Sequence, residues 1–108
     1  MAKIGDTTFF GDSRTIYNFG VFSPNSVFKD EVAAVYVFAA ENDKGQHQPL
    51  YVGETDKLGI EIPRQKASPV MRGKPAIHVC VHLDGDKTSR KSKKADLVAY
   101  YKPSGNAE

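Results

Sequence analysis

Two short apolar segments joined by a polar loop place the strongest constraint on how this chain can fold. The segments are residues 35–38 and 50–53, and the polar loop covers residues 41–48. β-Branched and aromatic residues fill both segments, and Gly, Pro and Asn occur around their ends. The pattern predicts a β-hairpin with one tyrosine inside each strand, Tyr36 and Tyr51.

These two tyrosines can stand side by side on one face of the predicted hairpin. A phenol both donates and accepts hydrogen bonds, so the pair could serve a reactive site. Aromatic cross-strand pairs are also ordinary packing contacts in sheets. Taken alone, Tyr36 and Tyr51 favour packing over chemistry.

The composition fits one globular domain, because 40% of the 108 residues are hydrophobic and 26% are charged. A net charge of +2 gives the whole molecule only a weak attraction for nucleic acid, so local clustering matters more. Residues 87–94 contain five basic residues and no acid. This cluster fits a nucleic-acid contact or an ordinary solvated helix face equally well.

Cys80 is the only cysteine, so the chain forms no internal disulfide and suits a reducing compartment. We expect its thiol to fill the core. The first residues lack the apolar segment of a secretory signal, and no apolar run approaches the roughly 18 residues of a membrane span. We therefore expect a cytoplasmic protein that has no membrane partner.

A second hairpin is predicted before the central one, from β-type runs at residues 7–10 and 15–22 around the turn residues 11–14. In its second strand the more apolar face is predicted to carry Thr15, Tyr17, Phe19 and Val21. This hairpin would make residues 1–31 an N-terminal extension.

A short helix should follow the central hairpin, with Asp56 suited to its N-cap. It carries Leu58, Ile60 and Ile62, and Pro63 should shorten or distort it. Pro and Gly then predict a loop over residues 67–75.

An apolar strand is predicted over residues 76–83, central in the sheet. His78 and His82 share one face of it but lie about 13 Å apart, too far to ligate one metal. We interpret both as packing or surface histidines, although His82 could reach a phosphate.

The last predicted element is a helix over residues 89–101, with Thr88 or Ser89 as its cap. Residues at i, i+3, i+4 and i+7 form its buried face: Lys94, Leu97, Val98 and Tyr101.

Three segments together resemble the GIY-YIG nuclease family. They are VYV at residues 35–37, YVGET at 51–55 followed by Leu58, and DLVAYYKPSGN at 96–106. The resemblance implies an α+β domain over residues 32–108, with a small mixed or antiparallel sheet flanked by helices. The N-terminal hairpin would be an addition to this fold within one compact unit.

The resemblance also implies a metal-dependent endonuclease site. In that site Tyr36 and Tyr51 would lie near the attacking water, and Asn106 would be the terminal site residue. The family's arginine position, however, holds Glu61, and its metal-binding glutamate position holds Lys94. A protonated lysine cannot ligate a metal ion. Arg64 lies three residues from the arginine register and is a weak substitute.

The two reversed charges are explained either by an ion pair between Glu61 and Lys94 in place of the metal site or by two independent surface changes. We therefore expect no metal or other cofactor, unless the protein is active, when Mg²⁺ or Mn²⁺ would be required. The leading hypothesis is an inactive nuclease-like domain that binds DNA. The residues expected to contact DNA are Gly53, Thr55, Arg64, Lys87, Arg90, Lys91 and Lys93. The alternatives are an active endonuclease that uses Glu54 or another carboxylate, and a protein-interaction module.

Overall fold

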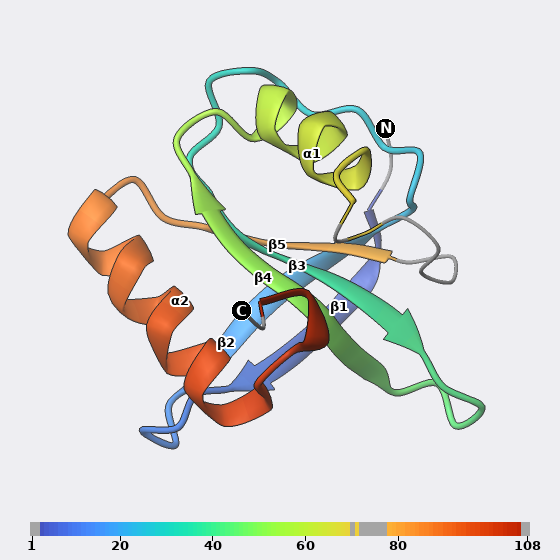
Figure 1. The fold of residues 1–108 in the computed structure, drawn as a ribbon, viewed down its shortest axis with the longest axis vertical. Coiled ribbons are helices and arrows are strands. Elements are labelled where there is room, and N and C mark those ends of the chain that lie inside the picture. The colour runs from blue at the N-terminus through green and yellow to red at the C-terminus, as the bar shows by residue number, and fades with distance from the viewer. Residues whose placement is uncertain (1–2, 70, 72–77, 107–108) are drawn as a thin grey trace.

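The computed structural model describes residues 3–69, 71 and 78–106. Five strands form one antiparallel sheet in the order β1-β2-β5-β3-β4, and two helices pack against it (Figure 1). The elements are β1 (Lys3–Phe10), β2 (Ile16–Phe22), β3 (Ala34–Glu41), β4 (His47–Thr55), α1 (Leu58–Lys66), β5 (His78–Leu83), α2 (Lys87–Tyr101) and the 3₁₀ turn η1 (Ser104–Asn106). The predicted α+β class is confirmed, and the sheet is antiparallel throughout.

Strand β3 is the centre of the fold. It pairs with β4 on one side and β5 on the other, and residues 34–39 are completely buried. Tyr36 and Phe38 face α1, whereas Val35 and Val37 face α2. Because both faces of β3 are covered, its sequence is a continuous apolar run rather than an alternating one.

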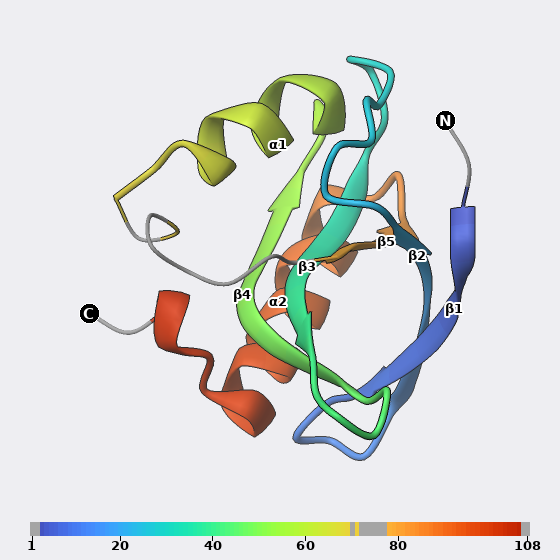
Figure 2. The same ribbon diagram turned by 90° about the vertical axis from the view of Figure 1, so that its right-hand side faces the viewer.

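The N-terminal hairpin predicted from the sequence is present, and it continues the main sheet through pairing of β2 with β5. Phe9, Phe19 and Val21 are buried in the same core cluster as Leu97 of α2. The sheet twists and curves, which brings the hairpin around to α2 (Figure 2). The N-terminal hairpin therefore contributes side chains to the core, although most of β1 is exposed.

Helix α1 begins without the side-chain cap expected from Asp56. Lys57 is the N-cap residue, and the first amides donate instead to the carbonyls of Val32 and Lys29. A Cβ atom on Gly59 would lie 2.3 Å from the Phe28 carbonyl oxygen, so glycine permits this close approach. The helix continues past Pro63 but is only nine residues long, as short as predicted.

Helix α2 begins at Lys87 after the N-cap Asp86, so the prediction of Thr88 or Ser89 as the cap is wrong. The Ser89 hydroxyl donates a 2.6 Å hydrogen bond to the Asp84 carboxylate instead of capping the helix. Three of the four residues on the predicted buried face of α2 pack on the core: Leu97 is buried, and Val98 and Tyr101 pack against the same cluster. Lys94, the fourth, is half-buried and lines a cavity.

Within strand β5, Cys80 is buried in the core as expected, and burial raises the pKa of its thiol to about 12. Residues 76 and 77 of the predicted strand, and most of the loop predicted after residue 69, lie outside the described residues. Neither helix in the described ranges is long and apolar enough to cross a membrane.

Candidate functional site

Tyr36 and Glu61 form the central contact of the site. The Tyr36 hydroxyl donates a 2.9 Å hydrogen bond to the Glu61 carboxylate, and the ring centroids of Tyr36 and Tyr51 are 6.0 Å apart. Burial raises the pKa of Tyr36 far above its ordinary value, with further contributions from Tyr51 and the Glu61 charge. Burial also raises the pKa of Tyr51. Both phenols therefore remain protonated and cannot act as phenolate bases near neutral pH.

Gly53 allows Tyr36 to occupy this position. The two residues are opposite each other in the β3–β4 pairing, and a Cβ atom on Gly53 would lie 2.3 Å from the Tyr36 ring. The tyrosine ring therefore lies against the bare backbone of β4. This contact gives Gly53 a packing role, whatever else the site does.

The Glu61 carboxylate is also bound from within its own helix. It forms an ion pair with Arg64 and accepts a 3.2 Å hydrogen bond from Gln65, three and four residues further along α1. The Glu61 side chain is 13% exposed, whereas the Arg64 side chain is 72% exposed. Glu61 is thus a largely buried acceptor with three donors, and Arg64 lies at the solvent side.

Arg90 is a buried link between α2, β4 and the segment before α2. It is only 3% exposed, its Nε donates to Glu54 at 3.0 Å, and its Nη1 donates to the Asp84 carbonyl at 3.2 Å. Removing one partner of a buried ion pair is strongly destabilising. The expectation that Arg90 contacts DNA fails on this burial.

The ammonium group of Lys93 is also bound within the protein. Its ammonium lies 2.9 Å from the Asp84 carboxylate and 2.9 Å from Nε2 of His82. Hydrogen bonds from Lys93 and Ser89 are the leading causes of the lowered pKa of Asp84. His82 itself contacts the Asn18 carbonyl through Nδ1, which supports the packing interpretation of this histidine.

Glu61 and Lys94 do not form the predicted ion pair. Glu61 borders a cavity of about 270 Å³, and Lys94 borders a separate one of about 400 Å³, with Glu54 lining both. Among the described residues the only ion pair of Glu61 is with Arg64, and Lys94 has none. Arg64, three residues further along α1, forms the ion pair with Glu61, so the Glu61 charge is balanced without Lys94.

The site residues do not fit the divalent metal that the resemblance implies. Lys94 offers no ligand oxygen where a carboxylate would be needed. The two nearby carboxylates, Glu54 and Glu61, line the same cavity of about 270 Å³, but each already binds an arginine. The positive charges of Arg64 and Arg90 beside these carboxylates oppose a second cation there.

Asn106 holds η1 against β4. Its side-chain Oδ1 accepts from the Val52 amide at 2.8 Å, and its Nδ2 donates to the Val52 carbonyl at 2.9 Å. The asparagine thus pairs with the strand edge as another strand would. Thr55, another expected site residue, accepts from the Lys57 amide at 2.9 Å in the turn before α1.

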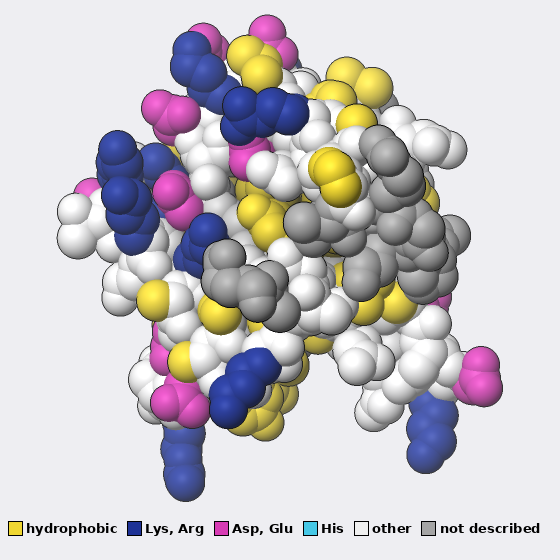
Figure 3. Space-filling model, viewed as in Figure 1, with side chains coloured by type: hydrophobic (Ala, Val, Ile, Leu, Met, Phe, Trp, Pro, Cys, Tyr) yellow, Lys and Arg dark blue, Asp and Glu magenta, His cyan; other side chains and the backbone are white. Residues whose placement is uncertain are grey.

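Three lysines lie in a row along one face of α2. Lys87 borders the smaller cavity, and Lys91 and Lys94 border the larger one. Within the described chain none of the three forms an ion pair, and Lys87 and Lys91 are exposed. Basic side chains gather over α1 and the first half of α2, with acidic ones between them (Figure 3).

This row was missed by counting basic residues over 87–94. The spacing of Lys87, Lys91 and Lys94 is i, i+4 and i+7, which places them on one helix face. That spacing was the available signal. The same rule places Arg90, at i+3, beside the row, so only its burial against Glu54 distinguishes it from the three lysines.

No protein family, curated protein or solved structure matches this chain. The GIY-YIG resemblance therefore depends on the sequence motifs alone and stays a hypothesis.

Proposed function

We propose that this protein is a catalytically inactive, GIY-YIG-like domain that binds DNA along helix α2. The supporting observation is the row of Lys87, Lys91 and Lys94, which lies beside two cavities and lacks acidic partners among the described residues. Over seven residues an α-helix rises about 10 Å. Successive phosphates of one strand could therefore meet all three ammonium groups, as in backbone binding without sequence readout.

Arg64 extends this surface on the other side of the smaller cavity. Its guanidinium is mostly exposed and can contact a phosphate in two places while it remains beside Glu61. Arg90 and Lys93 have a different role in this proposal, since they hold Glu54 and Asp84 and so fix the start of α2.

The argument for inactivity starts from Glu61. A carboxylate beside Tyr36 repels the phosphate that a nuclease must bind there, whereas an arginine would attract it. Lys94 supplies no carboxylate for a metal, and Tyr36 is held as a hydrogen-bond donor to Glu61. This arrangement supplies neither a carboxylate at the family's metal-binding position nor a phenolate base, so we expect no hydrolysis of a phosphodiester.

Two alternatives follow from the same site. An active endonuclease could use Glu54 as a metal ligand, but Glu54 is committed to the buried Arg90. A protein-interaction module would need only the fold, and the fold by itself does not define function. The single cysteine supports a cytoplasmic location for any of the three.

The test combines binding and cleavage on the same preparation. Fluorescence anisotropy with a labelled duplex and a labelled single strand should show binding that weakens as salt is raised. Supercoiled plasmid with Mg²⁺ or Mn²⁺ should show no nicking above that of the Tyr36→Phe, Tyr51→Phe variant. Nicking abolished by the two substitutions would establish an active nuclease, and absence of binding would favour the interaction module.

A further inference from the structure

A second cluster of reactive side chains lies at the end of the sheet near the β3–β4 loop. Glu41 and His47 are paired across β3 and β4, and His78 on β5 is paired with Ala39, two residues before Glu41. The three side chains thus come from three adjacent strands. Glu41 follows Val35, Val37 and Ala39 on the face of β3 opposite to Tyr36, so the cluster is separate from the site described above.

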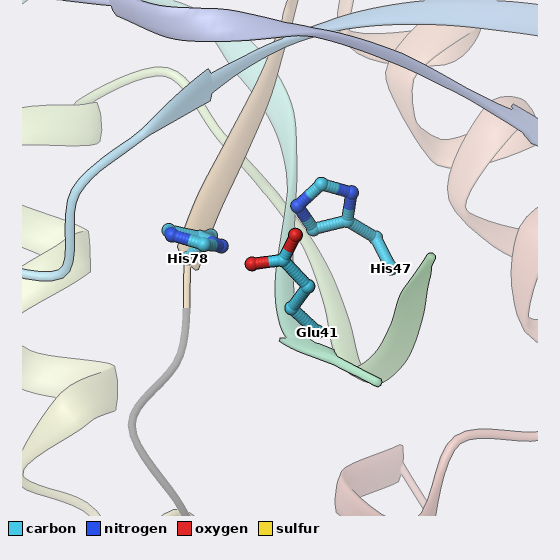
Figure 4. A group of neighbouring side chains, drawn as sticks. All are labelled: Glu41, His47 and His78. Carbon is cyan, nitrogen blue, oxygen red and sulfur yellow. The ribbon is translucent and has the colours of Figure 1, made fainter. Parts of the chain in front are cut away.

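The three side chains point toward one another. One nitrogen of each histidine and one oxygen of Glu41 all lie within 4.8 Å of each other. The carboxylate lies between the two imidazoles in Figure 4. Even so, no direct hydrogen bond or ion pair joins these groups in the described structure, which leaves a space between the nitrogen and oxygen atoms.

Two ring nitrogens in this cluster lack the partner that buried polar atoms normally have. His47 Nε2 and His78 Nδ1 are shielded from solvent and form no hydrogen bond with a described residue. The rings contact each other edge to face, with centroids 5.3 Å apart. Buried polar atoms are nearly always satisfied, so two such atoms in one cluster need a partner from outside the protein, either a water molecule or an ion.

We propose that Glu41, His47 and His78 bind a late first-row divalent metal ion of the Zn²⁺ class. Two imidazoles and one carboxylate form a ligand set that zinc sites use, whereas Mg²⁺ and Ca²⁺ prefer oxygen ligands throughout. Zinc bonds of about 2.0–2.2 Å at tetrahedral angles place ligand atoms about 3.4 Å apart. The observed separations, all within 4.8 Å, allow distances larger than this value, so metal binding would require the three side chains to move closer together.

Such a metal would connect β5 to the β3–β4 hairpin and leave one coordination position open to water or a small ligand. An ion bound to His47 Nε2 and His78 Nδ1 would satisfy both shielded nitrogens. Because the site uses none of the residues assigned to DNA binding, it does not depend on that function.

The test is titration of the untagged protein with ZnCl₂, followed by calorimetry and by thermal unfolding. We expect one equivalent to bind and the thermal midpoint to rise, since an ion that binds only the folded state stabilises it. His47→Gln and His78→Gln should each weaken binding by about tenfold or more, given the losses seen even for residues that only support metal ligands. His82→Gln removes the third histidine of the chain outside the cluster and should bind zinc as the parent protein does.

Glu41→Gln guards against variants that simply fail to fold, because Glu41 is exposed and its replacement should leave the metal-free midpoint unchanged. This variant should still bind zinc more weakly than the parent. Absence of saturable zinc binding would overturn the site. Affinity unchanged in the two histidine variants, or equal stabilisation by MgCl₂, would overturn it as well.

Discussion

The hydroxyl of Tyr36, on the central strand, donates a hydrogen bond to the carboxylate of Glu61 on helix α1. The bond joins a fully buried tyrosine to a largely buried acid, so it holds α1 to the sheet. In the family resemblance these two positions would carry a catalytic tyrosine and an arginine. Hydrogen bonds to a charged acceptor are stronger than neutral ones. The contact therefore stabilises the fold and occupies the tyrosine.

Energetic coupling between Tyr36 and Glu61 is the first prediction. Tyr36→Phe and Glu61→Gln should each destabilise the protein, by about 1–3 kcal/mol for a hydrogen bond to a charged group. The double variant should lose less than the sum, with a coupling of about 0.5–3 kcal/mol, as found for residues in contact. Urea unfolding measures all three, and Tyr100→Phe, at an exposed tyrosine, serves as the control. Additive losses would show that the bond contributes nothing.

The second prediction is that Glu61 and Lys94 contribute independently to the stability of the fold. Glu61→Arg should destabilise the fold because it loses the Tyr36 contact and places two cations beside each other at Arg64. Lys94→Glu acts on a different cavity, so the two changes should add within about 0.5 kcal/mol. Stability recovered in the double variant would contradict the structure and restore the ion pair expected from the sequence.

Leu97 tests the packing of α2 on the sheet. It is 1% exposed and lies in the core cluster with Val35 and Phe9. Leu97→Asp should prevent folding or lower the thermal midpoint steeply, because an unpaired charge would be buried. Ala99→Asp adds the same charge at an exposed position of the same helix and should have a small effect. Similar midpoints for the two variants would remove α2 from the core.

The contact between the N-terminal hairpin and α2 should stabilise the fold less at low pH than at neutral pH. Asp96 accepts from the Ser13 hydroxyl and from the Tyr17 hydroxyl, both at 2.6 Å, and these hydrogen bonds hold the pKa of Asp96 below its ordinary value. A carboxyl group with a lowered folded-state pKa stabilises the fold above its unfolded pKa of about 3.9 and loses that stabilisation as the pH falls through the folded value.

Asp96→Asn should therefore lower the thermal midpoint at pH 7, and the difference from the parent protein should shrink below about pH 4. Midpoints measured between pH 2.5 and 7.5 provide the comparison. Asp43→Asn, at an exposed loop residue, should follow the parent at every pH. A difference for Asp96→Asn that stayed constant with pH would contradict this account of the contact.

Much of the fold was predictable because the sequence signals were local. Residues 35–38 and 50–53 carry strand-forming residues with turn residues beside them, and both hairpins appear where expected. Helix starts were less predictable. Asp56 looks like an N-cap, but the first amides of α1 find backbone carbonyls from the segment before β3 instead. These tertiary contacts satisfy the backbone N–H groups that a capping side chain would otherwise bind.

The site was predictable only in part, since its charges depend on partners far apart in the sequence. Arg90 belongs to a basic cluster by composition but is buried against Glu54, 36 residues earlier. The proximity of His78 to His47 likewise could not be predicted from their spacing in the sequence. His78 lies on β5 and His47 on β4, and β3 lies between these strands in the sheet. Sequence spacing along one element does not show which elements become neighbours.

The most direct test of the proposed function is the salt dependence of DNA binding in two matched triple variants. One replaces Lys87, Lys91 and Lys94 with glutamine, and the other replaces three exposed lysines elsewhere, Lys29, Lys44 and Lys102, so that both lose the same net charge. Each lost phosphate contact should reduce the slope of log Kobs against log salt by about 0.9 on duplex DNA, so the first variant should lose about 2 to 3. The second should keep the slope of the parent protein. Equal slopes for the two variants would contradict DNA binding along α2.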